Sequence, residues 1–394
     1  MDNCVNKSIL IIIPRMPFPL NSGGRLAIFE TIKSLSRHYS VSIIIIDDNN
    51  KNEKYIPEIH KISKNVFFYN KPKYKFILNA LLGFIKGLPL QVGYFYFNDV
   101  QKIVDKESKT HDIIYCFMIR TTLYGINLKN YKIHNSIDSL FLSYKKSLEK
   151  TTSIFWKMIY YIESKRLFKI EKSHLSSYNL TTFVNLEECM FWSNYGNCMT
   201  LPHGVEDSIF LYNKFDVKFK NVISFIGRMD YQPNIDAVKW FLINVMPLLN
   251  KGILFHIIGG YATSNLVNFV KRYPNCYLLG YLEDPYINLA SNICTIAPMQ
   301  TGGGLQTKIL LAMGLGSIVV TTSYSVSAIE GAVNGDNILV EDNPIKFASI
   351  INNIYNNPEK FVSIKESAKE LIKNHYSVSV LEKKLCNIIE NTNT

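Results

Sequence analysis

Short apolar runs, each followed by a turn rich in glycine or proline and then by a helical segment, recur along this chain and restrict its fold more than any other feature. The first half opens with a strand pattern at 8–13, a proline-rich loop at 14–20 and a helix expected from Arg25, and a second strand is expected at 41–46. Runs of Ile and Val without polar alternation are typical of parallel strands covered on both faces. The first half is therefore predicted to be an α/β domain around a parallel sheet.

The second half repeats this alternation. A strand is expected at 222–226, a helix at 237–249, and further strands at 253–258, 276–279, 293–297 and 318–321. This order is typical of a doubly wound α/β domain, in which ligands bind outside the carboxyl ends of the strands. We therefore predict an α/β fold of two tandem Rossmann-like, doubly wound domains facing each other across a cleft. We expect a first domain at residues 1–204 and a second domain at 205–376. Residues 377–394 are expected to form a C-terminal helix that returns to the first domain and ends in a polar tail.

Composition supports two globular domains with different partners. A chain of 394 residues with 47% hydrophobic and 19% charged residues is long enough for about two cores and is unlike a disordered protein. Residues 1–200 hold 27 Lys and Arg against 16 Asp and Glu, whereas residues 201–394 hold 16 of each kind. The whole net charge of +11 therefore lies in the first half. The first domain is expected to face an anionic partner.

The cysteines and the hydropathy pattern indicate a reduced compartment. Seven scattered cysteines without a CxxC pair favour free thiols over a disulfide framework or a zinc site, and no histidine has metal-ligand spacing with another histidine or with a cysteine. The apolar run at 9–13 is too short for a signal-peptide core, and no run approaches the roughly 18 to 20 residues of a membrane span. We expect a cytoplasmic protein, either dissolved or peripheral to a membrane, without a metal.

A glycine turn at 301–308, with the sequence TGGGLQTK, is the clearest candidate for a ligand site. It lies between an apolar run at 293–299 and a helical segment at 309–315. A strand, a glycine-rich turn and a helix together present backbone N–H groups and a helix N-terminus to an anion, and Lys308 adds a cation. The expected ligand is a phosphate or a diphosphate, and the alternative is an ordinary tight turn.

Several segments together resemble a known family. The segment 225–238, FIGRMDYQPNIDAV, resembles bacterial glycosyltransferases of family 4, in the branch of the exopolysaccharide sugar transferases. The resemblance covers nearly the whole chain, because further motifs of that branch follow the same order as in this sequence: a Pro-Leu-Gln-Val-x-Tyr-Phe segment at 89–95, Asp138-Ser139 at a strand end, a hinge motif at 202–205 and the proline-ended strand with its glycine triplet at 297–304.

The resemblance implies a GT-B fold and a metal-independent, retaining transfer of a sugar from a nucleotide diphosphate. The nucleotide sugar is then a substrate, and no cofactor is expected. Arg228 would neutralise the diphosphate, Lys308 would add a point charge, and Asp138 would serve the acceptor side. The donor-binding residues implied by the resemblance are Gly23, Gly24, Gly227, Gly280, Gly302, Gly303, Gly304, Leu305, Thr307 and Glu330.

The chain departs from the family pattern at two places. Family-4 enzymes typically carry two glutamates eight positions apart around the glycine turn, which correspond here to Gly303 and Leu311. The first is commonly glycine in this branch, but the second usually holds the donor ribose, and leucine cannot accept a hydrogen bond. The lysine that many relatives place shortly after the arginine is missing as well, because residues 231–234 read Tyr-Gln-Pro-Asn.

Each candidate residue also has a structural interpretation. Arg228 can occupy a surface turn, Asp138 can cap the helix that follows it, Lys308 can point into solvent from a helix face, and Glu330 can cap a turn before Gly331. The segment 71–103 mixes lysines with large apolar side chains. It suits an anionic membrane surface, or it forms an ordinary core helix with a basic rim. Nucleic-acid binding is disfavoured, since no recognised binding module accompanies the basic half.

The leading hypothesis is a retaining glycosyltransferase that extends a bacterial surface glycan, on a lipid-linked acceptor, in capsule, exopolysaccharide or lipopolysaccharide synthesis. One alternative is a degenerate GT-B protein that acts as a scaffold for an active transferase. Another is a GT-B isomerase such as a nucleotide-sugar epimerase. The epimerase would need a cluster of carboxylates and histidines for which the sequence offers no match.

Overall fold

The structure is a computed structural model that describes residues 7–20, 23–302 and 304–393. The chain divides into two compact units, which are Met1–Pro202 together with Glu382–Thr394, and His203–Leu381. We call them unit 1 and unit 2. The sequence placed the corresponding boundaries after residues 204 and 376.

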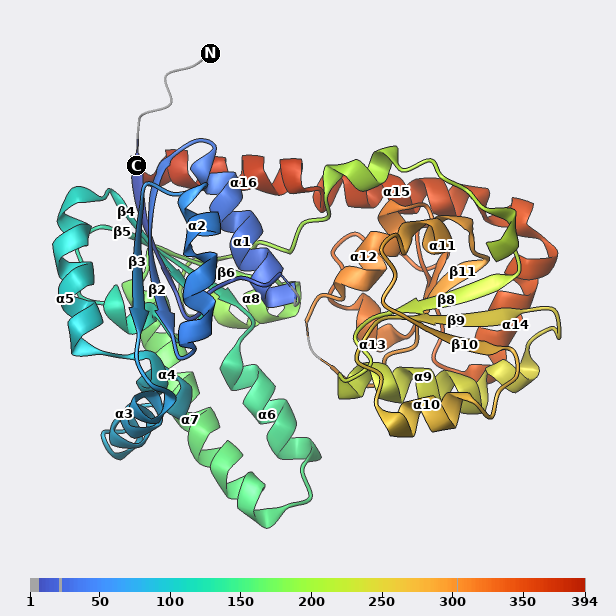
Figure 1. Cartoon of the computed structure of the whole chain (residues 1–394), viewed down its shortest axis with the longest axis horizontal. Coiled ribbons are helices and arrows are strands. Elements are labelled where there is room, and N and C mark those ends of the chain that lie inside the picture. Colours follow the sequence, from blue (N-terminus) through green and yellow to red (C-terminus); the bar gives the residue numbers. More distant parts are fainter. Residues whose placement is uncertain (1–6, 21–22, 303, 394) are drawn as a thin grey trace. The chain divides into compact units, whose positions relative to one another are not determined.

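Unit 1 is built on a sheet of seven parallel strands in the order β3-β2-β1-β4-β5-β6-β7 (Figure 1). After their first residues, β1 and β2 are buried throughout, which is why the sequence shows long Ile runs there. The strands are β1 (Ser8–Ile13), β2 (Ser40–Asp47), β3 (Asn65–Asn70), β4 (Ile113–Phe117), β5 (Tyr131–Ile137), β6 (Leu180–Phe183) and β7 (Cys198–Thr200).

The helices of unit 1 cover its sheet and add two packed helix pairs, α3 with α4 and α6 with α7. Apart from the strand end expected at Asp138, the strands of unit 1 after β2 and the 24-residue helix α7 were not predicted from the sequence. The helices are α1 (Gly23–Ser36), α2 (Ile56–His60), α3 (Lys73–Ile85), α4 (Leu90–Phe95), α5 (Asn98–Glu107), α6 (Leu140–Lys150), α7 (Ile154–Ser177) and α8 (Leu186–Ser193).

Unit 2 repeats the architecture with six parallel strands in the order β10-β9-β8-β11-β12-β13. Its strands are β8 (Val222–Ile226), β9 (Leu254–Ile258), β10 (Cys276–Gly280), β11 (Cys294–Ala297), β12 (Val319–Thr321) and β13 (Leu339–Val340). Its helices are α9 (Gln232–Asn244), α10 (Ser264–Val270), α11 (Tyr286–Ser291), α12 (Thr307–Gly314), α13 (Ser323–Val326), α14 (Pro344–Asn356) and α15 (Val362–His375).

Both sheets contain the strand order 3-2-1-4-5-6, counted within each unit, that defines a Rossmann-like fold. The predicted doubly wound α/β architecture is therefore confirmed for each unit. Helix α9 begins at Gln232, five residues before the expected start, because Pro233 is tolerated in the first turn of a helix.

The last helix, α16 (Val378–Glu390), contributes to both units, since the division falls between Leu381 and Glu382. On the side of unit 1, Glu382 accepts hydrogen bonds from Arg37 and His38, and the Lys7 ammonium donates to the Ile389 carbonyl oxygen at 2.7 Å. No helix in the described part of the chain combines the length and the apolar character that a membrane crossing requires.

Candidate functional site

The carboxyl ends of three neighbouring strands in unit 2 are held together through glycines. The Gly227 N–H, just after β8, donates to the Ile258 carbonyl at 2.9 Å, and the Gly259 N–H, just after β9, donates to the Gly280 carbonyl at 2.8 Å. Gly259 has a φ of +145°, and a Cβ there would lie 1.8 Å from the Gly227 carbonyl oxygen. Only glycine fits this position. The edge at which ligands of parallel sheets bind is therefore closely packed backbone.

Lys308 points into this edge. Its ammonium hydrogen-bonds the Asn234 side-chain oxygen, and it lies 4.4 Å from the centre of the Phe225 ring and 3.7 Å from the Met299 sulfur. All of these partners are neutral, and burial lowers the pKa of Lys308 to about 7. The alternative of a solvated lysine on a helix face is therefore wrong.

Asn234 connects Lys308 with Arg228. The Asn234 amide nitrogen donates to the Arg228 carbonyl at 2.8 Å, while its amide oxygen accepts from Lys308. A Cβ on Gly227 would lie 2.7 Å from that amide nitrogen and 3.3 Å from the Lys308 ammonium. Glycine at 227 thus leaves the space in which the Asn234–Lys308 pair sits.

The Arg228 side chain lies on the surface and forms a two-pronged ion pair with Asp230. Its Nε and Nη2 atoms lie 3.0 and 2.6 Å from the two carboxylate oxygens, and its guanidinium stacks over Tyr261. The hydrogen bond with Asp230 raises the pKa of Arg228, and the same bond lowers the pKa of Asp230. Exposed pairs of this kind contribute little to stability, and the Nη1 edge remains available to an anion.

The predicted glycine turn packs on the first turn of α9. Gly302 and Gly304 have φ values of +99° and +77°, which L side chains rarely adopt, and a Cβ on Gly302 would lie 3.0 Å from Pro233. Gly303 lies outside the described residues. Leu305 is buried, and Thr307 begins α12, whose first turn contains no acidic residue. The N-terminus of α12 is therefore suited to an anion.

Of two further predicted donor-binding residues, Gly280 is joined to this edge through its carbonyl, which accepts the Gly259 N–H at 2.8 Å. Gly280 ends β10 with a φ of +69°. Glu330 is exposed, and its backbone carbonyl accepts a hydrogen bond from the Tyr376 hydroxyl at 3.0 Å. Leu311 lies on α12 one turn after Lys308 and is partly buried, so the position offers an alkyl surface and no hydrogen-bond acceptor.

A hollow lies at the opposite, amino-terminal edge of the same sheet. Its lining includes Lys220, Asn292, Tyr355 and Lys365. Since ligands of open parallel sheets bind at the carboxyl edge, we assign the site to the Lys308 edge.

In unit 1, Gly23 and Gly24 open helix α1 after the β1 loop. A Cβ on Gly23 would meet no described atom within 4 Å, and one on Gly24 would meet only the Met118 methyl group at 4.0 Å. Packing inside the described structure therefore does not require glycine here. A requirement for close approach by a ligand would explain both residues.

Asp138 lies at the end of β5 and is exposed, but it does not cap the following helix. Ser139 is the N-cap of α6, because its hydroxyl accepts the Leu142 N–H at 3.2 Å. The Ser139 hydroxyl donates to Glu171 and its N–H donates to Glu188, each at 2.6 Å. The alternative role of Asp138 as a helix cap is therefore wrong.

Three carboxyl groups lie close together at this point of unit 1. Burial raises the pKa of Glu171 to about 7 and that of Glu188 to about 8, and the charge of Asp138 adds to the second effect. Although Asp138 keeps exposed surface, desolvation by the surrounding protein also raises the pKa of its carboxyl group. The group can therefore hold and release protons near neutral pH, which suits an acceptor-side role for Asp138.

Sequence reasoning did not single out Asn234, Asp230, Gly259 or Tyr261. Asn234 and Asp230 lie within the motif at 225–238, but the motif does not reveal their contacts. Asn234 bonds Lys308 on another helix, and the pairing of Asp230 depends on the conformation of the Arg228 side chain. Gly259 follows an expected strand end, which was the available signal. Within the described ranges, no three His, Cys, Asp or Glu side chains are arranged to hold a metal ion, and the metal-free reaction stays a prediction.

Comparison with known proteins supports the glycosyltransferase resemblance. Residues 220–357 match the family described as "Glycosyl transferases group 1". A Klebsiella pneumoniae protein, described as an uncharacterized 44.6 kDa protein in the cps region, is 26% identical over 385 residues, which cover 93% of this chain and 96% of that protein. The resemblance to glycosyltransferases that the motifs predicted is confirmed, and the cps-region relative supports its exopolysaccharide branch.

Solved structures share the fold over nearly the whole chain. Anabaena HepE, solved in complex with UDP, has a TM-score of 0.69 at 14% identity and covers 98% of this chain and all of its own. WaaG, a glycosyltransferase involved in lipopolysaccharide biosynthesis, has a TM-score of 0.64 at 13% identity, with 97% and 99% covered. These likenesses confirm the GT-B fold.

Replacing Gly259 by alanine is expected to destabilise unit 2 by roughly 3 kcal/mol, because a Cβ would force the β8 and β9 ends apart. The midpoint of urea unfolding, followed by circular dichroism, measures the effect. Gly260→Ala is the matched control, since a Cβ there would meet only Tyr281 at 4.0 Å. Equal midpoints for the two variants would contradict the packing argument.

The contribution of Glu188 to stability is expected to fall between about pH 5 and pH 8, because the folded pKa of Glu188 is raised from 4.5 to about 8. The folded state keeps a proton there that the unfolded state releases, so the favourable contribution is complete below pH 4.5 and is lost as the pH rises. Glu188→Gln should flatten this slope and raise the melting temperature at pH 8. The exposed neighbour variant Glu187→Gln should change neither, and a Glu188→Gln slope equal to wild type would refute the assignment.

Proposed function

We propose that this protein is a retaining, metal-independent glycosyltransferase that moves a sugar from a nucleotide diphosphate to a growing bacterial surface glycan. The donor diphosphate would bind at the carboxyl edge of unit 2, against Lys308, Arg228 and the glycine turn. The family match over residues 220–357 and the cps-region relative support this assignment. The UDP in the HepE structure supports a nucleotide donor.

The observation that carries the proposal is the environment of Lys308. A buried ammonium with only neutral partners loses solvation and gains no charge in return, which is costly to the fold. A diphosphate supplies the missing negative charge. The ammonium bonds Asn234, which belongs to the stretch 231–234 where relatives carry the absent lysine. We infer that Lys308, on α12, supplies the positive charge that this missing lysine provides in the relatives.

The chemistry requires such fixed charges. The bond between the anomeric carbon and the diphosphate oxygen breaks, and the acceptor hydroxyl oxygen forms its bond on the same face of the sugar. The hydroxyl proton passes to the departing phosphate oxygen. Negative charge accumulates on the diphosphate, where Lys308, Arg228 and the α12 N-terminus would stabilise it without reorganisation. Asp138 would orient the acceptor hydroxyl from unit 1.

A scaffold without catalytic activity is the second candidate, because Leu311 offers no acceptor to the ribose. Saturable nucleotide binding separates the two. A scaffold of this kind binds no nucleotide, whereas the enzyme binds UDP, GDP or ADP and transfers the sugar.

The protein is further proposed to act at the cytoplasmic face of the membrane on a lipid-linked acceptor. Helix α3 exposes six large apolar side chains, and the exposed fraction is largest for Ile85, at 81%. The exposed lysines 73, 75 and 86 lie beside them in the sequence. The first turns of α7 expose five more large apolar side chains near the exposed Lys157, and the exposed fraction is largest for Ile154, at 86%. Apolar surface flanked by lysines matches an anionic lipid surface. The exposed apolar residues are Tyr74, Ile77, Leu78, Leu81, Leu82 and Ile85 on α3, and Ile154, Phe155, Trp156, Met158 and Tyr161 on α7.

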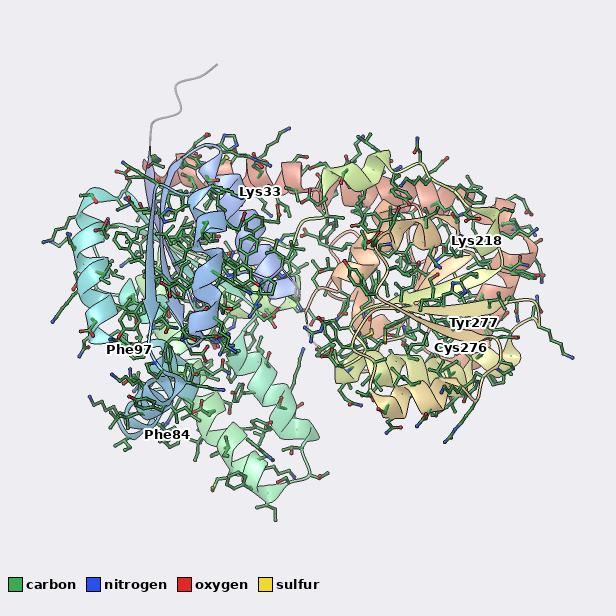
Figure 2. The ribbon with its side chains drawn as sticks, in the orientation of Figure 1. Lys33, Phe84, Phe97, Lys218, Cys276 and Tyr277 are labelled. Atoms are coloured by element: carbon green, nitrogen blue, oxygen red, sulfur yellow. The ribbon has the colours of Figure 1, made fainter. Side chains whose placement is uncertain are left out.

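These two helices form one structural feature of unit 1. The Arg166 guanidinium on α7 donates to the Phe84 and Leu88 carbonyls at 2.7 and 3.2 Å and lies 3.9 Å from the centre of the Phe84 ring. Figure 2 labels Phe84, which lies on α3. The Leu90 N–H donates to Glu163 on α7 at 2.9 Å. Both helices lie at the lower end of unit 1 in the view of Figure 1. We propose that this end docks on the membrane.

The donor assignment is tested by titrating the purified protein with UDP, GDP and ADP and by assaying the corresponding sugars with glycan acceptors. For the nucleotide that binds, Lys308→Gln and Arg228→Ala should each weaken binding by roughly tenfold to a hundredfold, since charged hydrogen bonds are lost. Lys346→Gln, an exposed lysine of α14, is the matched control. Absence of nucleotide binding, or no effect of either variant, would refute the proposal.

Nucleotide binding should also depend on pH through Lys308. Free Lys308 has a pKa of about 7, and a bound diphosphate raises that pKa, so binding takes up a proton. Between pH 7 and pH 9 the affinity should fall by up to about tenfold per pH unit. Calorimetry in buffers of different ionisation enthalpy measures the proton uptake, which Lys308→Gln should abolish. Uptake that persists in this variant would show that another group is responsible.

Docking is tested by sedimentation with vesicles of phosphatidylglycerol and of phosphatidylcholine. The protein should bind the anionic vesicles, more weakly at high salt, and the double variant Leu81→Glu/Ile85→Glu should reduce binding by roughly tenfold or more. Ile345→Glu, which changes an exposed isoleucine of unit 2, is the control. Equal sedimentation of the double variant and wild type would exclude this surface, and self-association without lipid would indicate a second copy as its partner.

A further inference from the structure

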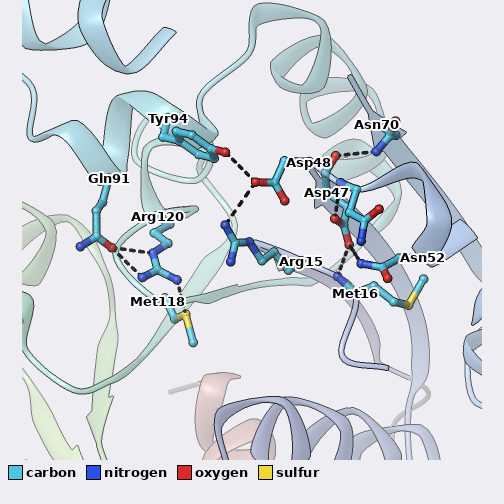
Figure 3. A network of polar contacts seen from close by, with 11 residues as sticks. Arg15, Met16, Asp47, Asp48, Asn52, Asn70, Gln91, Tyr94, Met118 and Arg120 are labelled. Atoms are coloured by element: carbon cyan, nitrogen blue, oxygen red, sulfur yellow. Dashed lines mark hydrogen bonds and ion pairs between the residues drawn. The ribbon is translucent and has the colours of Figure 1, made fainter. Parts of the chain in front are cut away.

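A second cation with only neutral hydrogen-bond partners lies in unit 1. Arg120 follows β4, and its Nε and Nη2 atoms donate to the Gln91 side-chain oxygen at 2.9 and 2.6 Å (Figure 3). Its Nη1 atom lies 3.5 Å from the Met118 sulfur. Among the residues that the structure describes, no carboxylate lies within ion-pair distance of Arg120. The guanidinium is thus oriented by neutral groups, and its charge is not neutralised by them.

Arg15 places another positive charge beside it. The guanidinium carbons of Arg15 and Arg120 lie 5.6 and 5.8 Å from the centre of the same Phe95 ring. Asp48 pairs with Arg15 at 3.3 Å and also accepts the Tyr94 hydroxyl hydrogen bond (Figure 3). Among the described residues, Asp48 is the only carboxylate that forms an ion pair with either guanidinium. Burial and the charge of Arg15 lower the pKa of Arg120, as expected for a cation that lacks a counter-charge.

The surroundings have the character of a built site at the carboxyl edge of the unit 1 sheet. Arg15 and Met118, which follow β1 and β4, have φ values of +147° and +59°. Strained backbone of this kind persists only where the surrounding structure holds it in place, and it is concentrated at active sites and ligand-binding sites. A Cβ on Gly24 would lie 4.0 Å from the Met118 methyl group, so the N-terminus of α1 lies beside the methionine whose sulfur contacts Arg120. That N-terminus carries no acidic residue in its first turn.

We propose that Arg120, assisted by Arg15 and the N-terminus of α1, binds an oxyanion of the acceptor, either a phosphate or a carboxylate. The planar guanidinium fork, held from one side by Gln91, presents its remaining N–H groups to two oxygens of such a group. That the bound molecule is the acceptor rests on the proposed function, in which unit 2 holds the donor. The oxyanion site itself rests only on the geometry of unit 1.

The test follows the arginine Nε–H signals of the full-length protein by NMR during titration with inorganic phosphate and, separately, with glucuronate, at constant ionic strength. One probe should shift the Arg120 signal, which is assigned by its loss in Arg120→Gln. A shift with phosphate alone identifies a phosphate-bearing acceptor, and a shift with glucuronate alone identifies an acidic sugar. Absence of any shift with both probes overturns the proposal.

Variants separate the site from its neighbours. Arg15→Gln should weaken the binding of the active probe to Arg120 by roughly threefold to tenfold, and Arg120→Lys should weaken acceptor use, measured as KM, by roughly tenfold or more while kcat changes less. Arg228→Ala should leave the probe binding unchanged. Melting curves confirm that each variant is folded, and unchanged KM in folded Arg120→Lys and Arg120→Gln would refute the acceptor role.

The donor offers the other source of an oxyanion, and competition distinguishes it. Saturating nucleotide should leave the Arg120 titration unchanged if the acceptor binds there, whereas displacement of the probe would place donor phosphate at Arg120 and overturn the acceptor assignment. If no nucleotide binds at all, the proposed function fails, but the phosphate and glucuronate titrations still decide whether Arg120 binds an oxyanion.

Discussion

The contact between the Gly259 backbone and the Gly227 carbonyl is the constraint on which the candidate donor site depends. A Cβ at 259 would collide with the Gly227 carbonyl oxygen, whereas a Cβ at 227 would lie 2.7 Å from the Asn234 amide nitrogen. The same absence of a Cβ at 227 leaves space for Asn234 and Lys308, and Asn234 fixes the Arg228 carbonyl in turn. Backbone packing at the sheet edge thus sets the position of two charges that come from different helices and loops.

Lys308 and Arg120 show the same electrostatic arrangement in separate units. Each is oriented by a side-chain amide oxygen, from Asn234 or Gln91, and each lies near an aromatic ring. An amide oxygen directs a cation without neutralising it, whereas a carboxylate would compete with an incoming anion. Arg228 is different, because Asp230 already pairs with it in an exposed position. The more buried cations are therefore the stronger indicators of ligand binding.

The sequence predicted the parts of this fold that depend on local pattern. Strands β1 and β8 match the expected ranges at both ends, since a run of buried β-branched residues bounded by turns needs no distant information. The glycine turn and Arg228 were likewise readable as motifs. Asn234 could not be assigned in this way, because its role follows from contacts with residues 6 and 74 positions away in the chain. Arg120 is similar, since its partner Gln91 lies in α4 and its like-charged neighbour follows β1.

The departures from the family pattern have different consequences once the contacts are considered. A missing lysine after the arginine removes a charge only if no other residue supplies it, and the Lys308 ammonium bonds that very stretch through Asn234. Electrostatic stabilisation depends on where a charge lies and not on which element carries it. The leucine at 311 has no such substitute on its own helix turn, because a ribose hydroxyl requires an acceptor atom and an alkyl group has none. The diphosphate end of a donor is therefore expected to be held more firmly than its ribose, so that discrimination falls on the phosphates and the transferred sugar.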